Sequence, residues 1–174
     1  AAQGMAVPDP AIREGLGRVR WPGRFEVIDR DQVLVLDGAH NPAGAQALAA
    51  SLKEAFGDQP RTLIVGISAD KDKAGILKAL VPAAARLILT ASTNPRATPP
   101  EDLRALLAPT DVPVEVAYSV DEALSLALSP PVTPIVCVTG SLFTVADALA
   151  IRRGGGDIPC EIERGSDTVE SLFS

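Results

Sequence analysis

Polar residues suited to binding anions and sugar hydroxyls follow three apolar segments of the chain. Leu36–Pro42 has the sequence LDGAHNP, Gly66–Asp72 has GISADKD, and Thr139–Phe143 has TGSLF. Carboxylates accept hydrogen bonds from hydroxyl groups, and ammonium groups pair with carboxylates and phosphates. Each segment comes at the end of a run that its residue types predict to be a strand. These three segments are therefore the first candidates for a binding site.

The first segment combines a carboxylate, a glycine turn and the start of a helix. The Asp37 carboxylate suits the hydroxyls of a ribose, while His40, the only histidine, and Asn41 suit a base or a phosphate. A second interpretation is structural, with Asn41 as the N-cap of a helix that begins at Pro42. The spacing alone leaves both interpretations open.

Cationic and hydroxyl groups elsewhere are candidates for an anion site. Lys71 follows a predicted strand and suits a carboxylate or phosphate, although charge runs such as ADKDK are often only solvated. Ser141 follows Gly140 at the start of a predicted helix, where N–H groups and a hydroxyl form either an anion site or a plain N-cap. Arg24 in WPGRFE and Arg96 in an NPR turn carry planar guanidinium groups that suit phosphates, although an arginine before a strand is often structural.

Several common catalytic motifs are absent from the sequence. It contains no Gly-Lys pair, hence no G-x-x-x-x-G-K-[ST] phosphate loop, and no G-x-G-x-x-G fingerprint. One histidine and two distant cysteines give no zinc-binding spacing, so we expect no metal site in this chain. A histidine-based hydrolase triad would have to use His40.

Short β-branched runs alternate with amphipathic helical stretches along the chain. Strands are predicted at Phe25–Ile28, Val33–Asp37, Thr62–Ile67, Leu87–Thr90, Val114–Ala117 and Ile135–Thr139. Helices are predicted at Pro42–Phe56, Lys73–Leu80, Pro100–Leu107, Val120–Leu128 and Leu142–Ile151. Nearly continuous apolar strands are typical of sheets covered on both faces. The pattern predicts an α/β fold, a Rossmann-like, doubly wound and mostly parallel six-stranded sheet with helices on both faces. Ligands bind such sheets at the carboxyl ends of the strands.

The ends of the chain differ from its middle. We predict a linker over residues 1–20 with one short helix near Pro10–Leu16, a domain over 21–152, and a polar, mobile tail over 153–174. The 174 residues suffice for one hydrophobic core.

Charge and cysteine content narrow the class of protein further. The formal net charge of −6 argues against binding nucleic acid or an anionic membrane through the whole surface. Cys137 and Cys160 make no disulfide framework, and the sequence has neither a signal peptide nor a long apolar run. We therefore expect a soluble cytoplasmic protein that binds neither nucleic acid nor a membrane.

Taken together, the motifs resemble a known ligase family. WPGRFEVI, VLDGAHNPAGAQALA, VGISADKDKAGIL, TNPRA and VTGSLFTVADAL follow one another as in the C-terminal domain of the dihydrofolate synthase/folylpolyglutamate synthase family, within the Mur ligase superfamily. The resemblance runs from Leu16 to Ile151. Other Mur-type ligases usually carry a DYAHNP-like variant, whereas DGAHNP together with WPGRFE is specific to the folate branch.

The resemblance implies an ATP-dependent ligase of folate biosynthesis and one-carbon metabolism. In that family a carboxylate of dihydropteroate or of a folate glutamate tail is phosphorylated by ATP, and the amine of L-glutamate then displaces the phosphate. The phosphate loop and most ligands of Mg²⁺ belong to an N-terminal ATPase domain. We therefore expect ATP, Mg²⁺ and that domain to be partners of this chain, and the chain alone to be inactive.

The resemblance also implies which residues bind the substrates. Those assigned to ATP are Arg24, Asp37, His40 and Asn41. Those assigned to the incoming glutamate are Lys71 and Ser141. Gly140 and Arg96 are further candidates for the same site, with no ligand assigned to them.

Two alternatives differ in the class of function. One is the domain of another Mur-type amino-acid ligase, such as a cell-wall peptide ligase, which the pair DGAHNP and WPGRFE disfavours. The other is a stand-alone nucleotide- or amino-acid-binding module without catalysis. A phosphate loop encoded in frame upstream would favour the ligase.

Overall fold

One six-stranded sheet forms the centre of the molecule in the computed structural model, which describes residues 8–19, 21–28 and 32–154. The strands are β1 (Glu26–Ile28), β2 (Val33–Leu36), β3 (Arg61–Val65), β4 (Arg86–Leu89), β5 (Val114–Val116) and β6 (Ile135–Thr139). Their order is β1-β2-β6-β3-β4-β5. Only the pair β1–β2 is antiparallel, and all other neighbours are parallel. The predicted α/β fold is confirmed.

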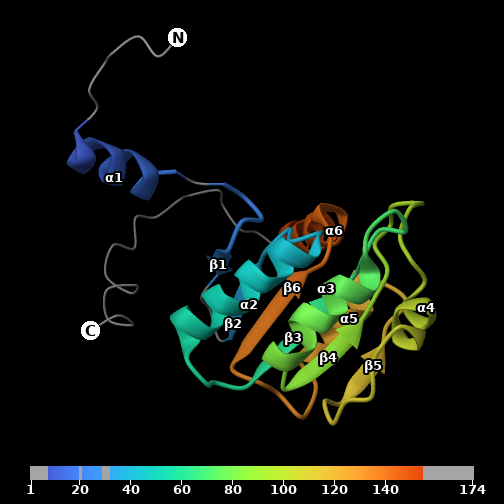
Figure 1. Ribbon diagram of the computed structural model, residues 1–174. Helices are drawn as coiled ribbons and strands as arrows, with labels where there is room; N and C mark the ends of the chain where they lie inside the picture. The colour runs from blue at the N-terminus through green and yellow to red at the C-terminus, as the bar shows by residue number, and fades with distance from the viewer. Residues whose placement is uncertain (1–7, 20, 29–31, 155–174) are drawn as a thin grey trace.

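Helices cover both faces of this sheet (Figure 1). The helices are α1 (Asp9–Gly17), α2 (Pro42–Phe56), α3 (Lys73–Leu80), α4 (Pro100–Ala105), α5 (Val120–Ala127) and α6 (Leu142–Gly154), with a short 3₁₀ turn η1 (Val81–Ala83). One core cluster joins α2 and α3 to Val35 and Cys137, and the other joins α5 and α6 to Leu36 and Val138. Successive strand residues face opposite sides of the sheet, and helices cover both sides. The side chains on both faces of the strands are therefore apolar, so each strand is a continuous apolar run.

The strand order brings the three polar segments to one edge of the sheet. β6 lies between β2 and β3, although it is the last strand of the chain. The chain passes from β2 to β3 through α2 on one face and returns to β6 through α5 on the other. Backbone hydrogen bonds extend past the strands, from Asp37 N–H to Val138 O at 3.1 Å and from Gly66 N–H to Thr139 O at 3.1 Å. This is the point at which doubly wound sheets bind ligands.

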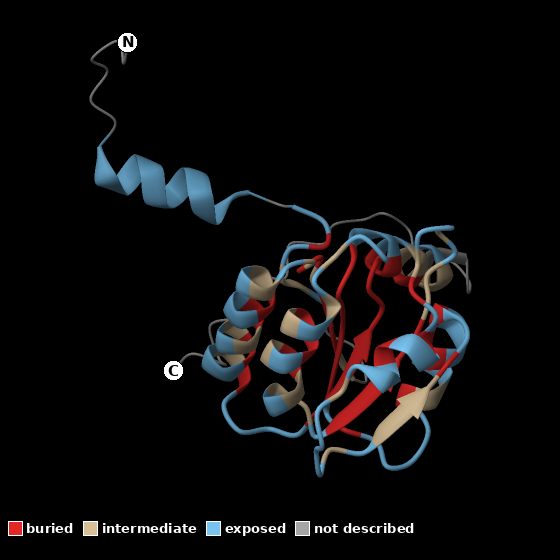
Figure 2. Cartoon of the chain, turned by 45° about the vertical axis from the view of Figure 1, so that its right-hand side comes forward, coloured by how far each residue is buried: buried red, intermediate tan, exposed pale blue. Residues whose placement is uncertain are grey.

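The predicted helix near the N-terminus is present as α1, and it is exposed along its whole length (Figure 2). None of its residues is buried, and the assignment of residues 1–20 to a linker stays a prediction. The predicted tail falls almost wholly on residues 155–174, which lie, with Cys160, outside the described residues. Within residues 8–19, 21–28 and 32–154, no helix combines the length and apolar character needed to cross a membrane.

The prediction that the first strand begins at Phe25 is wrong. Phe25 has a φ of 44°, which is incompatible with an extended strand, and β1 begins at Glu26. The N–H of Phe25 donates to the Asp37 carboxylate at 2.8 Å instead of to a neighbouring strand. The other predicted strand and helix limits differ from the structure by no more than a few residues, as is common at element ends.

Candidate functional site

The Asp37 carboxylate organises the turn between β2 and α2. Its Oδ2 accepts a hydrogen bond from Phe25 N–H at 2.8 Å, and its Oδ1 accepts one from Ala39 N–H at 2.8 Å. Asp37 is half-buried, so these two bonds replace water on a group that is costly to desolvate. The carboxylate therefore ties the turn before β1 to the end of β2, a structural role that the sequence did not predict.

The backbone carbonyl of Gly38 bonds to two of the side chains that the sequence predicts to bind a nucleotide. It accepts hydrogen bonds from Arg24 Nη1 at 3.3 Å and from His40 Nδ1 at 2.8 Å. A carbonyl only accepts, so Nδ1 of His40 carries a proton and, in the neutral ring, Nε2 is an acceptor. A Cβ atom at Gly38 would lie 2.3 Å from Leu142 Cδ2, at the start of α6. The turn after β2 and the start of α6 are thus in close contact.

Asn41 is the N-cap of α2. Its side-chain oxygen accepts a hydrogen bond from Gly44 N–H at 2.7 Å, and Pro42 is the first residue of the helix. The capping interpretation is therefore confirmed. The remaining N–H groups of the first turn lie at the positive end of the helix dipole. Contact of Asn41 with a nucleotide stays a prediction.

Two buried hydroxyl groups meet where β3 and β6 end. Ser68 Oγ lies 3.4 Å from Ser141 Oγ, and the two residues are 7% and 4% exposed. Ser141 Oγ also accepts a hydrogen bond from Phe143 N–H at 3.2 Å, which is a capping contact for α6. Gly140 permits the approach: it has a φ of 94°, and a Cβ atom there would lie 2.7 Å from Gly66 O.

Two cations lie in the neighbouring loops that follow β3 and β4. Lys71 Nζ lies 3.0 Å from Asp70, and its side chain is 37% exposed. The hydrogen bond from Lys71 holds the pKa of the Asp70 carboxyl below its ordinary value, and the charge of Arg96 lowers it further. The Arg96 guanidinium carbon lies 5.3 Å from the centroid of the Phe143 ring. Since Ala69 N–H donates to Arg96 O at 2.8 Å, the two loops are held together.

All the residues predicted from the sequence to bind substrates lie in loops at the carboxyl edge of the parallel strands, or in the turn that leads into β1. Sequence reasoning missed two further residues of this edge, Ser68 and Phe143. Ser68 stands inside the quoted segment GISADKD, and Phe143 inside TGSLF, but neither residue type has a distinctive spacing there. Their relevance depends on contacts with Ser141 and Arg96 that only the folded chain reveals.

The described residues provide neither a reactive thiol nor an evident cation site. Cys137 is fully buried in β6, and burial, followed by the negative charge of Asp37, raises the pKa of its thiol. That environment suppresses the thiolate and hence nucleophilic chemistry. In the part of the chain that the structure describes, no three His, Cys, Asp or Glu side chains gather as they would around a metal ion. The residues present therefore do not fit a dedicated Mg²⁺ site.

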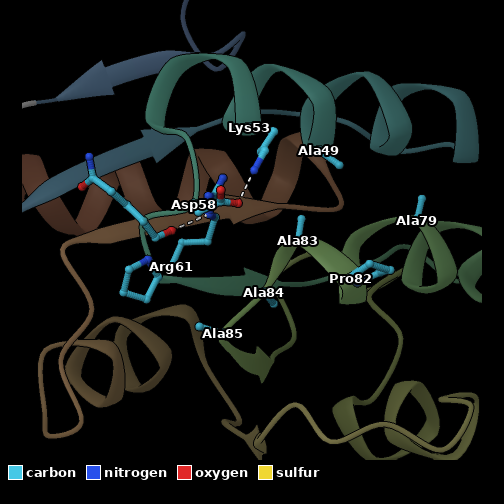
Figure 3. Close-up of a pocket in the computed structure, with 11 residues that line it drawn as sticks. Ala49, Lys53, Asp58, Arg61, Ala79, Pro82, Ala83, Ala84 and Ala85 are labelled. Carbon is cyan, nitrogen blue, oxygen red and sulfur yellow. Dashed lines mark hydrogen bonds and ion pairs between the residues drawn. The ribbon is translucent and has the colours of Figure 1, made fainter.

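A cavity of about 460 Å³ lies at the opposite edge, near the amino ends of β3 and β4 (Figure 3). Alanines make up much of its lining, together with Lys53, Asp58 and Arg61. Lys53 pairs with Asp58, and Arg61 donates to Gly57 O and Gln59 O at 2.5 and 3.1 Å, which completes the end of α2. Lys53 and Arg61 thus stabilise the end of α2, and their charges already have partners. We therefore place the candidate site at the carboxyl edge of the sheet and not in this cavity.

Comparisons with known proteins show the family of this chain. The family model described as "Mur ligase, glutamate ligase domain" matches residues 23–142. The folylpolyglutamate synthase of Lacticaseibacillus casei is 38% identical over 146 residues, which are 83% of this chain and 32% of that protein. The crystal structure of the bifunctional folylpolyglutamate synthase/dihydrofolate synthase from Yersinia pestis, complexed with AMPPNP and Mn ion, is 31% identical. It matches 86% of this chain and 35% of that one, with a TM-score of 0.74.

A further crystal structure of such a bifunctional synthase contains Mn, AMPPNP and L-glutamate. It is 30% identical to this chain, matches 86% of it and 36% of the other chain, and has a TM-score of 0.73. The chain spans about a third of the length of these relatives. It belongs to the Mur ligase family, as a glutamate ligase domain similar to those of folylpolyglutamate and dihydrofolate synthases, as its motifs predicted.

Proposed function

We propose that this domain contributes the glutamate contacts and part of the nucleotide contacts of an ATP-dependent ligase. The reaction is amide formation between L-glutamate and a carboxylate of dihydropteroate or of a folate glutamate tail. The observation that carries the proposal is the contact between two turns: the one after β2, with Asp37 and His40, and the one after β6, with Ser141. Such contact suits a reaction in which ATP phosphorylates a carboxylate and the amine of an amino acid then attacks the carbon of that same carboxyl group.

The glutamate side of the site is built from cations and hydroxyls. Glutamate carries two carboxylates, and Lys71 and Ser141, with Arg96 as an additional candidate, offer charge and hydrogen-bond donors from adjacent loops. Lys71 is half-exposed and, among the described residues, pairs only with the exposed Asp70, so a substrate carboxylate can compete for it at small cost. Gly140 contributes by letting the backbone before Ser141 approach β3 closely.

Chemically, this domain is proposed to orient the amine. The amine nitrogen attacks the carbonyl carbon of the acyl phosphate, the bond from that carbon to the phosphate oxygen breaks, and phosphate leaves with the electron pair while the nitrogen loses a proton. Holding the glutamate by its carboxylates leaves its amine free and turns a bimolecular encounter into a positioned one. No described residue is assigned to remove the proton.

The nucleotide side is proposed to consist of Arg24, Asp37, His40 and Asn41. Arg24 is exposed and uses one of its five donors on Gly38, which leaves others for phosphate oxygens. The His40 Nε2 acceptor suits a hydroxyl or amino donor of the nucleoside. The rest of the phosphate contacts and the Mg²⁺ ligands are proposed to come from the ATPase domain, since the described residues offer no acidic cluster.

ADP release by the full-length protein tests this function. We expect release that needs ATP, Mg²⁺, L-glutamate and either dihydropteroate or a folate, and none from this chain alone. Folate-independent release with a muramyl peptide acceptor would favour the cell-wall ligase instead. Nucleotide or glutamate binding without any turnover would favour a binding module.

A further inference from the structure

The turn before β1 has a backbone conformation that is unusual for its residue type. Phe25 has a φ of 44°, in the left-handed region that residues other than glycine rarely adopt. Such a conformation persists only where surrounding contacts impose it, and it is concentrated at functional sites. The contacts that hold Phe25 in this conformation therefore indicate the role of the turn.

Each backbone N–H of the turn has a defined partner. Gly23 N–H donates to Glu26 Oε2 at 2.9 Å, Arg24 N–H to Trp21 O at 3.1 Å, and Phe25 N–H to Asp37 Oδ2 at 2.8 Å. The backbone on both sides of Arg24 is thus fixed, whereas its side chain is exposed. This arrangement is a rigid base for one exposed cation.

Among these partners, Asp37 is the one that connects the turn to the candidate site. Its second oxygen accepts from Ala39 N–H at 2.8 Å, so one carboxylate holds both the turn before β1 and the turn after β2. Two more hydrogen bonds join the turn before β1 to the turn after β2, from Gly38 N–H to Gly23 O at 2.8 Å and from Arg24 Nη1 to Gly38 O at 3.3 Å. The direction of the Arg24 guanidinium therefore depends on Asp37.

We propose that Asp37 is a positioning residue. By holding Phe25 in its strained conformation, its carboxylate directs Arg24 toward the nucleotide phosphates above the turn after β2. The inference rests on the proposed function, because it requires ATP to bind at this edge. It is separate from a contact with the ribose, since a carboxylate has about four acceptor positions and the two backbone bonds occupy two of them.

A double-mutant cycle on the full-length ligase tests this role. The Michaelis constant for ATP is measured for the wild type, Arg24→Ala, Asp37→Asn and the double variant. The amide introduced by Asp37→Asn retains the shape of the side chain but has only one acceptor oxygen, so it cannot hold both backbone N–H groups. Arg24→Ala should raise the constant roughly ten- to a hundred-fold, the range for a charge-assisted hydrogen bond. The factor by which Asp37→Asn raises it should be about threefold or more larger in the wild type than in the Arg24→Ala background.

Repeating the cycle with 2′-deoxy-ATP and 3′-deoxy-ATP separates positioning from ribose binding. The dependence of the Asp37 effect on Arg24 should persist with both nucleotides, since neither change touches the phosphates. Equal effects of Asp37→Asn with and without Arg24 would overturn the inference, and so would coupling that vanishes with the deoxy nucleotides. The Michaelis constant for glutamate should stay nearly unchanged, whereas general damage to the fold would raise both constants.

A second variant keeps the inference testable if Asp37→Asn folds poorly. Glu26→Ala removes the other carboxylate that holds the turn, through Gly23 N–H, and leaves Asp37 in place. It should raise the Michaelis constant for ATP only in the presence of Arg24, and an equal rise in the Arg24→Ala background would contradict the role of the turn. A wild-type protein that does not consume ATP would refute the proposed function and the inference together. Normal ATP consumption with independent effects would refute the inference alone.

Discussion

The hydroxyl of Ser141 lies 3.4 Å from that of Ser68, and both residues are buried although they border the candidate site. The contact joins the ends of two neighbouring parallel strands, β6 and β3, and the two serines are 73 positions apart in the sequence. Ser141 in addition caps α6 through Phe143 N–H. A substrate carboxylate that reaches Ser141 therefore meets a hydroxyl whose direction is already restricted by two neighbours.

Replacing Ser141 with alanine should weaken glutamate binding moderately. A neutral hydrogen bond contributes about 0.5–1.5 kcal/mol, so the Michaelis constant for glutamate should rise roughly two- to tenfold. Initial rates of the full-length enzyme at varied glutamate provide the measurement. Ser125→Ala, at an exposed position of α5, is the matched control and should have no effect. An unchanged constant for Ser141→Ala would limit this residue to capping the helix.

Gly140→Ala should destabilise the domain, because Gly140 has a φ of 94° and an added Cβ would lie 2.7 Å from Gly66 O. A strained conformation of this kind costs about 1–3 kcal/mol, which corresponds to a loss of roughly 2–10 °C in melting temperature for a domain of this size. Thermal unfolding followed by circular dichroism measures it. Gly15→Ala, where an added Cβ would meet nothing within 4 Å, should not lower the melting temperature. An unchanged melting temperature for Gly140→Ala would contradict this prediction, because it would mean that the turn accommodates the added Cβ without strain.

The fold could be predicted from the sequence because its signals are local and repeated. Runs such as VLVLD and IVCVTG have the composition of strands buried on both faces, and α2 begins and ends at the residues that its apolar spacing and Pro42 indicated. The exceptions lie where a tertiary contact decides the conformation. Phe25 has the residue type of a strand, but a carboxylate twelve residues away holds it in the left-handed region.

The stability of the domain should fall at high pH because of Cys137. Burial, and next the charge of Asp37, raise the thiol pKa in the folded state above the ordinary value of 9.0. Above that pH the unfolded chain loses a proton that the folded chain retains, so the contribution is complete below about pH 9 and declines as the pH rises, by at most about 1.4 kcal/mol per pH unit.

Urea unfolding between pH 7 and 10 measures this decline, in a Cys160→Ser background so that one cysteine remains. Cys137→Ala in the same background should show a smaller decline over that range, because it lacks the titrating thiol. Thiol-directed reagents should label Cys137 only as fast as the domain unfolds. Rapid labelling of the native protein would contradict the burial of this side chain.

The sequence predicted where the residues of the candidate site lie, from their types and their positions after strands, but not the contacts between them. The polar residues after β2, β3 and β6 were expected at one edge, because parallel strands share their carboxyl ends. The double hydrogen bond of Asp37, and the stacking of Arg96 on Phe143, depend on distances between segments far apart in the sequence. Sequence spacing carries no information about such contacts.

The kinetics of Lys71→Ala test the central claim, that this edge of the sheet holds the incoming glutamate. Lys71 is half-exposed and pairs with the exposed Asp70, so its removal should leave the fold intact. A hydrogen bond to a charged group is worth roughly 1.5–3 kcal/mol, and the Michaelis constant for glutamate should therefore rise about ten- to a hundred-fold. The constant for ATP should change much less, since the nucleotide is assigned to Arg24 and Asp37.

Steady-state rates of the full-length enzyme, with each substrate varied in turn, make this measurement, and Lys78→Ala on the exposed side of α3 is the control. The account predicts a large rise for glutamate alone in Lys71→Ala and no change in Lys78→Ala. A rise in the constant for ATP, with that for glutamate unchanged, would contradict it.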